Sequence, residues 1–119
     1  MPQAIPLEKF AQVTLDASGN GTVSLGPAKF NESWQIDTVS TSVSTNVGAG
    51  GIIQEPQFAA YRDNVSQSAL IGGTYSGSFD YDNAFNYTVY SGRLIAFQWT
   101  GGVPGATASV HLYGTDNFA

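Results

Sequence analysis

The chain of 119 residues contains no cysteine and few positive charges. Without cysteine there is no disulfide framework, no thiolate nucleophile and no thiolate metal site. Four lysine and arginine residues stand against nine acids, for a net charge of −5, and the four are scattered singly. Nucleic acids and anionic membrane surfaces both select clustered basic side chains, so we expect neither as a partner.

Long apolar runs are missing as well. No segment is long and apolar enough to span a bilayer, and residues 1–10 lack the basic stretch and apolar core of a signal peptide. We therefore expect synthesis in a cytoplasm without export. A chain of this length accommodates one domain around a single hydrophobic core.

Helical patterning is also absent, since no stretch sustains an apolar period of three to four residues. Charged residues make up only 11% of the chain, too small a share for long exposed helices. Apolar and polar side chains instead alternate with the two-residue period of half-buried strands. The alternation predicts about eight strands, at residues 10–16, 23–25, 34–47, 57–62, 70–79, 85–90, 94–99 and 107–113.

The spacing of the turns predicts how these strands are assembled. Turns every eight to twelve residues are typical of an all-β fold, an antiparallel two-sheet sandwich or jelly roll. The Asn-Gly pair at residues 20–21 predicts a hairpin between the first two strands. A change of apolar parity predicts a bulge near Asp37 or Thr38. Trp34 and Trp99 lie on strongly patterned strands, so we expect both in the core.

Residues 1–9 contain two prolines and few strand formers, which predicts an extended arm ahead of a sandwich domain at residues 10–119. Such an arm frays unless something holds it. Two alternatives stay open: a neighbouring subunit binds the arm, or the arm lies along its own domain. In the first alternative the arm is a docking segment, and its candidate contact residues are Pro2, Gln3, Ile5, Pro6 and Leu7.

His111 is the single histidine of the chain. Strand parity puts it with Thr107, Ser109 and Tyr113, opposite an apolar set. A hydrolase triad needs its base held between a nucleophile and an orienting acid, and nothing in the sequence marks those partners. We interpret His111 as an exposed strand residue and expect no enzyme.

Paired carboxylates are the groups that hydrolyse glycosides, and two pairs are candidates. They are Asp80 with Asp82, and Glu32 with Glu55. Residues 80–83 predict a turn, so solvated turn acids explain the first pair better than a catalytic site does.

The same turn resembles the start of a calcium-binding loop. Phe85 stands where an EF-hand loop needs glycine, and Ser91 where it needs glutamate, so that motif fails. A looser calcium site in a β loop stays open, but we predict no cofactor.

The aromatic residues suggest a further chemistry, because tyrosine rings stack on sugars. Most of the six tyrosines must fill the core or its rim in a sandwich of this size. On predicted loops or turns, Tyr75, Tyr81 and Tyr90 would be available for a ligand.

Five segments carry a resemblance to known proteins: WQIDTVSTS at 34–42, PQFAAY at 56–61, GTYSG at 73–77, SGRLIAFQW at 91–99 and GGVPGATASV at 101–110. Their pattern resembles small β-sandwich modules in virion proteins of tailed phages that infect actinobacteria. The resemblance spans about residues 10–114.

The resemblance implies a non-enzymatic structural role in a virion. The leading hypothesis is a capsid decoration protein, made in the bacterial host cytoplasm, which docks on the lattice of the major capsid protein as a homo-oligomer such as a trimer. The main rival is a carbohydrate- or receptor-binding module of a phage tail or fibre that uses the loop tyrosines. A third class is a small hydrolase of cell-wall glycan that uses Asp80 and Asp82.

Overall fold

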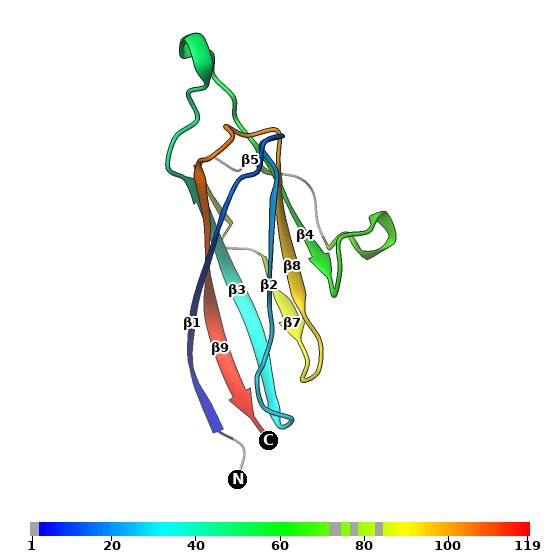
Figure 1. Cartoon of the computed structure of the whole chain (residues 1–119). Helices are drawn as coiled ribbons and strands as arrows, with labels where there is room; N and C mark the ends of the chain where they lie inside the picture. The colour runs from blue at the N-terminus through cyan, green and yellow to red at the C-terminus, as the bar shows by residue number, and fades with distance from the viewer. Residues whose placement is uncertain (1–2, 72–74, 77–78, 83–84) are drawn as a thin grey trace.

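A computed structural model describes residues 3–71, 75–76, 79–82 and 85–119 of the chain. The described residues form two antiparallel sheets that face each other across one core, which confirms the predicted sandwich (Figure 1). The molecule is elongated, with principal extents of 58 × 25 × 21 Å. Gln3 and Ala119, where the described part begins and ends, lie at one end of it, called the terminal end below, and the opposite end is called the far end (Figure 1).

Three long strands dominate the first sheet. β1 (Gln3–Thr14), β9 (Thr107–Phe118) and β3 (Glu32–Val43) lie side by side in that order, each 12 residues long. Two short strands, β6 (Phe79–Asp82) and β7 (Tyr87–Val89), pair with β3 on its other side.

The second sheet is smaller and has the order β2, β8, β4, β5. Its strands are β2 (Gly21–Leu25), β8 (Ile95–Thr100), β4 (Gln57–Arg62) and β5 (Tyr75–Ser76). β8 lies between two neighbours and buries four of its six residues, as a doubly covered strand should. The short helices η1 (Ala49–Gly51) and η2 (Gln67–Ala69) lie in connections.

Aromatic side chains fill the centre of the core. Phe58 stacks on Phe97 with ring centroids 5.5 Å apart and meets Trp99 at 5.1 Å. Trp99 Nε1 donates a hydrogen bond of 2.9 Å to Thr41 Oγ1 on the facing sheet, so the indole joins the two layers without leaving a buried donor unpaired. Trp34 and Trp99 are both buried, as predicted.

The predicted bulge is confirmed. The register between β3 and β9 shifts between Ile36 and Thr38, so Asp37 is the extra residue. The backbone of Gly114 passes very close to this point, since a Cβ there would lie 1.9 Å from the carbonyl oxygen of Gln35. Glycine is therefore required on β9 where it crosses the bulge.

The predicted hairpin at residues 20–21 is wrong. β1 pairs with β9 and β2 pairs with β8, so residues 15–20 carry the chain from one sheet to the other. The positive φ of 77° falls on Gly19. Alternation reports which face of a strand is buried and not which strand lies beside it, and this explains the error.

The predicted turn at residues 80–83 is also wrong for the part that the structure describes. Asp80 and Asp82 belong to β6, where they pair with Thr41 and Val39 of β3. Pairing with a long neighbouring strand outweighed the local turn propensity of the aspartates. Asn83 lies outside the described residues.

Residues 3–9 follow the second of the two alternatives for the arm. They form the first half of β1 and pair with β9 from Gln3 opposite Phe118 onward. Pro6 lies opposite Thr115 within this pairing, and β1 is an edge strand, the position in a sheet that tolerates proline. The segment is extended, as expected, and lies along its own domain.

Candidate functional site

The far end of the molecule carries a projecting hairpin, which we call the apolar hairpin (residues 45–54) (Figure 1). Its two arms are joined by hydrogen bonds of 2.7 Å from Gly48 N to Ile52 O and from Gln54 N to Asn46 O. The turn is completed by two glycines with positive φ, and a Cβ on either would meet nothing within 4 Å. The hairpin is therefore ordered by its own backbone and is open to solvent.

The exposed side chains of this hairpin include three large aliphatic ones beside the polar Thr45 and Gln54. Ile52 and Ile53 are 66% and 61% exposed, and Val47 is 47% exposed. The sequence has no charged residue from 45 to 54. A preformed, uncharged and apolar projection is a feature of protein contact sites, since a soluble surface normally interrupts such a cluster with charges.

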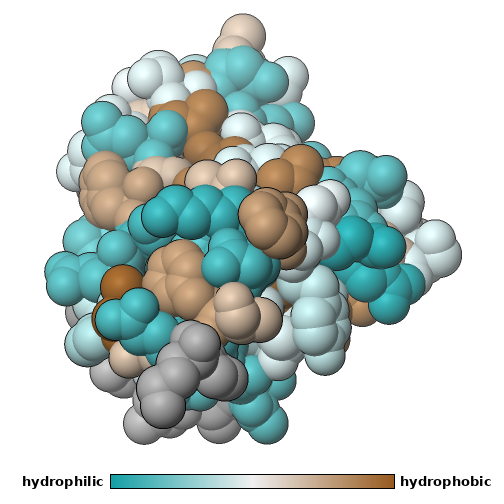
Figure 2. All heavy atoms as spheres, turned by 90° about the horizontal axis from the view of Figure 1, so that it is seen from below, coloured by the Kyte–Doolittle hydropathy of each residue, from teal (hydrophilic) through white to brown (hydrophobic). Residues whose placement is uncertain are grey.

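The terminal end exposes one large aromatic side chain. Phe30, in the connection between β2 and β3, is 93% exposed. Figure 2 views this end and shows hydrophobic side chains lying among hydrophilic ones. The two ends of the sandwich thus both offer apolar contact points, with a more mixed surface at the terminal end.

The predicted docking residues lie near the terminal end. Leu7 is buried in the core of its own domain, whereas Ile5 is 42% exposed and Gln3 is exposed. Pro2 lies outside the described residues. Docking by residues 1–9 stays a proposal, with Leu7 assigned to the core.

The terminal end also contains two buried carboxyl groups, Glu32 and Asp116, which we call the acid pair. These residues are only 7% and 5% exposed. Glu32 Oε1 accepts hydrogen bonds from the backbone N–H groups of Ala28 and Lys29 at 3.0 and 3.3 Å. Glu32 Oε2 accepts a bond of 3.1 Å from Trp34 Nε1. With three donors directed at it, Glu32 is held in its ionised form.

Asp116 is the carboxyl group of the pair that holds a proton at mildly acidic pH. Burial, together with a side-chain hydrogen bond to the Glu32 carboxylate and its charge, raises the pKa of Asp116 to about 6. Burial acts to raise the pKa of Glu32 too, but its hydrogen bonds outweigh that effect and lower the value. Two carboxyl groups that share a hydrogen bond must share a proton, so Asp116 is the donor.

Two lysines border the acid pair. Lys9 Nζ lies 5.6 Å from the ring centroid of Trp34, and Lys29 Nζ lies 5.5 Å from that of Phe118. Both charges act to lower the pKa of Asp116, but the combined effect of burial and of Glu32 in raising it is larger. Asp116 Oδ1 is buried and has no hydrogen-bond partner among the described residues. The arrangement leaves one buried oxygen unsatisfied, which is costly when Asp116 is ionised.

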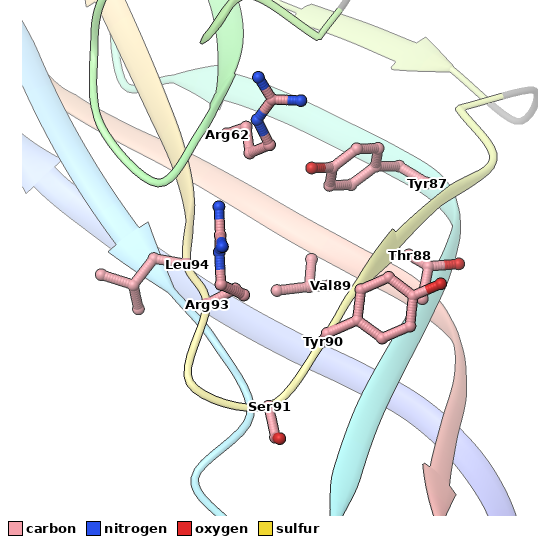
Figure 3. A pocket seen from close by; sticks show the side chains of 8 residues that line it. All are labelled: Arg62, Tyr87, Thr88, Val89, Tyr90, Ser91, Arg93 and Leu94. Carbon is pink, nitrogen blue, oxygen red and sulfur yellow. The ribbon is translucent and has the colours of Figure 1, made fainter.

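A third feature is a cavity of about 490 Å³ on the side of the sandwich where β7 leads into β8, which we call the open-side pocket. It lies between β7 of the first sheet and the end of β4 in the second (Figure 3). Its lining residues are Arg62, Tyr87, Thr88, Val89, Tyr90, Ser91, Arg93 and Leu94.

An ion pair fixes one wall of the open-side pocket. Arg93 Nε donates to Asp63 Oδ1 at 3.1 Å, and Arg93 Nη2 donates to Asp63 Oδ2. Leu94 N–H donates to the same carboxylate. The hydrogen bond from Arg93, followed by that from Leu94, lowers the pKa of Asp63, and the charge of Arg62 contributes less.

His111 lies on the outer face of the first sheet, as parity predicted. Its ring meets Phe10 edge-on with centroids 4.6 Å apart, and His111 Nδ1 lies 3.2 Å from the Tyr113 hydroxyl. Its aligned neighbours are Phe10 on β1 and Ser40 on β3. No hydrogen bond or ion pair joins His111 to an acid among the residues that the structure describes.

Of the two predicted carboxylate pairs, the structure separates one. Glu32 begins β3 at the terminal end, whereas Glu55 is exposed and follows the apolar hairpin at the far end (Figure 1). Asp80 and Asp82 are two apart on β6, and the side chain of Asp80 lies outside the described part. Within the described ranges, no three histidine, aspartate or glutamate side chains gather to hold a metal ion, and neither short helix is long and apolar enough to cross a membrane.

Of the predicted loop tyrosines, only Tyr90 has a described side chain, and it lines the open-side pocket at 66% exposure.

Sequence reasoning missed Asp116, Arg62 and Arg93. For Asp116 a signal existed, because the buried parity of β9 continues from residues 108, 110 and 112 to 116. For the arginines there was none, since 31 positions separate them along the chain.

No protein-family model matches the chain, and no curated protein sequence matches it. Solved structures with similar strand arrangements include the decameric BFDV capsid protein, with 9% identity over 100% of this chain and 99% of that chain and a TM-score of 0.46. The Yersinia pseudotuberculosis-derived mitogen has 12% identity over 91% and 86%, with a TM-score of 0.44. The SPBc2 prophage-derived protein YomS has 14% identity over 96% of each chain, with a TM-score of 0.40. Likenesses with TM-scores below 0.5 carry no argument about what this chain does.

Proposed function

We propose that the chain is a non-enzymatic structural protein of a virion, which decorates a capsid by docking on the lattice of the major capsid protein. The observation that carries the proposal is the apolar hairpin, an ordered and uncharged projection with Val47, Ile52 and Ile53 exposed. The hairpin would insert into an apolar recess on a neighbouring coat protein. The sequence resemblance to phage virion modules supports the same role.

The size of this contact argues for many copies. Burying three partly exposed aliphatic side chains contributes about 3 kcal/mol, whereas association costs at least about 4 kcal/mol in lost freedom of movement. One hairpin alone is therefore too weak to hold the protein on a surface. A homo-oligomer such as a trimer presents several hairpins at once, and each added contact becomes intramolecular.

The terminal end supplies the second contact in this proposal. Phe30 and Ile5 are exposed there, some distance from the apolar hairpin along the long axis of the molecule (Figure 1). A rigid body with apolar contact points at both ends can bridge neighbouring subunits of a shell. The extended segment at residues 3–9, held on β9, would bring Ile5 to that contact.

The direct test is co-sedimentation of the purified protein with emptied capsids of the particle that encodes it. We expect the natural chain to sediment with the capsids and an Ile52→Ser, Ile53→Ser double variant to lose at least nine-tenths of its binding. Thr45→Ala, in the same hairpin but without loss of apolar surface, is the matched control and should bind normally. Equal binding by the double variant, or no binding by the natural chain, would refute the proposal.

A further inference from the structure

The open-side pocket gathers a disproportionate share of the positive charge of the molecule. The whole chain has four lysine and arginine residues and a net charge of −5, yet Arg62 and Arg93 both line this one cavity. The other two basic residues, Lys9 and Lys29, lie at the terminal end beside the acid pair. A concentration of guanidinium groups in an otherwise acidic protein favours an anionic ligand there.

The two arginines differ in whether their guanidinium groups already have a partner within the protein. Arg93 is held by two hydrogen bonds to Asp63, which fixes its position and offsets one unit of charge. The guanidinium group of Arg62 makes no hydrogen bond or ion pair within the described part of the chain. The local balance of two guanidinium groups and one carboxylate is one positive charge, enough for one ligand carboxylate, which a guanidinium binds in bidentate fashion.

The other side chains that line the pocket form surfaces against which a sugar ring can pack. Figure 3 shows the hydroxyl end of Tyr87 pointing toward the side that carries both arginines, with Tyr90 on the other side and Val89 between them. Val89 is buried and forms an apolar floor, whereas the ring of Tyr90 is 66% exposed. Exposed tyrosine rings pack against the apolar faces of sugars, and their hydroxyls pair with sugar hydroxyls.

We propose that the open-side pocket binds an acidic saccharide, with the sugar carboxylate at Arg62 and Arg93 and the sugar ring against Tyr90. A cavity of about 490 Å³ accommodates one or two sugar units. The site shares no residue with the apolar hairpin or with Phe30. It is therefore independent of capsid docking, and either proposal can fail without the other.

The test is a titration of the full-length protein, followed by amide chemical shifts, with three probes at equal ionic strength. The probes are sodium D-glucuronate, D-glucose as the matched neutral sugar, and inorganic phosphate as the matched simple anion. We expect glucuronate to shift the amides of residues 87–94 and to bind at least about tenfold more tightly than either control, the difference that one charge-assisted hydrogen bond provides.

Variants assign the binding to particular side chains. Arg62→Gln should weaken glucuronate binding at least about tenfold, whereas Lys29→Gln removes the same charge at the terminal end and should leave binding unchanged. Tyr90→Ala should weaken binding and Tyr90→Phe should retain it. Thermal melting of each variant checks that it is folded.

Several outcomes would overturn the proposal. Equal binding of glucose and glucuronate would show that the arginines do not select the ligand, and equal binding of phosphate would reduce the pocket to a general anion site. An Arg62→Gln variant that is folded and binds as the natural chain does, or a protein that responds to none of the three probes, would also contradict it.

Discussion

The far end of the sandwich exposes aliphatic side chains on an uncharged hairpin, whereas the terminal end buries two carboxyl groups beside two lysines. The core does not include Val47, Ile52 or Ile53 of this hairpin, so these positions are free to serve a contact with another molecule. The terminal end joins β1, β3 and β9, so its chemistry bears on the stability of the fold. Exposed apolar side chains occur at both ends and mark contact points that the core does not need, whereas the buried carboxyl groups lie where β1, β3 and β9 are held together.

The largest expected effect falls on the terminal end. Glu32→Ala removes the acceptor of three N–H donors and leaves Asp116 without its partner, so the free energy of unfolding should fall by about 3 to 5 kcal/mol. Urea denaturation at pH 5 measures it. Glu8→Ala, an exposed acid on β1, is the control and should change stability by less than about 0.5 kcal/mol. Equal effects of the two substitutions would show that the acid pair does not hold this end.

A smaller effect, and one of opposite sign, is expected at Asp116. Its pKa in the folded protein is about 6, above the value of 3.8 for the free side chain, so between these values the folded state binds more protons than the unfolded state. Stability should therefore fall as pH rises from about 4 to about 6, by about 2 to 3 kcal/mol in total, and stay at that reduced level above pH 6. Glu32 acts in the other direction, because its pKa is lowered and its contribution is lost as pH falls below about 4.5.

Asp116→Asn isolates this contribution. The amide donates to Glu32 as the protonated acid does, but it never ionises. The variant should be more stable than the natural chain at pH 8, by about 2 to 3 kcal/mol, and this difference should shrink as pH falls toward about 4. A variant with the same loss of stability between pH 4 and 6 as the natural chain would assign that loss to other groups.

The apolar hairpin should show the smallest effect on stability. Ile52→Ser with Ile53→Ser exchanges exposed side chains, so the melting temperature should stay close to that of the natural chain while capsid binding is lost. Phe30→Ser makes the same test at the terminal end, where it should weaken capsid binding without affecting folding. A marked fall in melting temperature for either variant would contradict the distinction between exposed contact residues and the residues that stabilise the fold.

Alternation of apolar and polar residues predicted the parts of the fold in which one face of a strand is buried. Gln57–Arg62 is a strand as expected, and Ala108, Val110 and Leu112 all face the core. The same pattern says nothing of pairing partners, so the hairpin expected at residues 20–21 is a crossing between sheets. A local pattern cannot distinguish these cases because the partner strands, β9 and β8, lie far along the chain.

The candidate sites depended even more on pairing between distant segments. Asp116 and Glu32 are 84 positions apart, and only the register of β9 beside β3 brings them together. The expected strand at residues 107–113 ended too early because Gly114 and the polar residues after it break the apolar pattern. The bulge at Asp37 and the close passage of Gly114 let the pairing continue to Phe118, and this places an acid in the core.

The proposed role is tested most directly by the number of copies of the chain in each purified virion, measured by quantitative mass spectrometry against the major capsid protein. A decoration protein that docks on a repeating lattice should be present in hundreds of copies per particle. Absence from the particle, or a count of only a handful, would contradict the account.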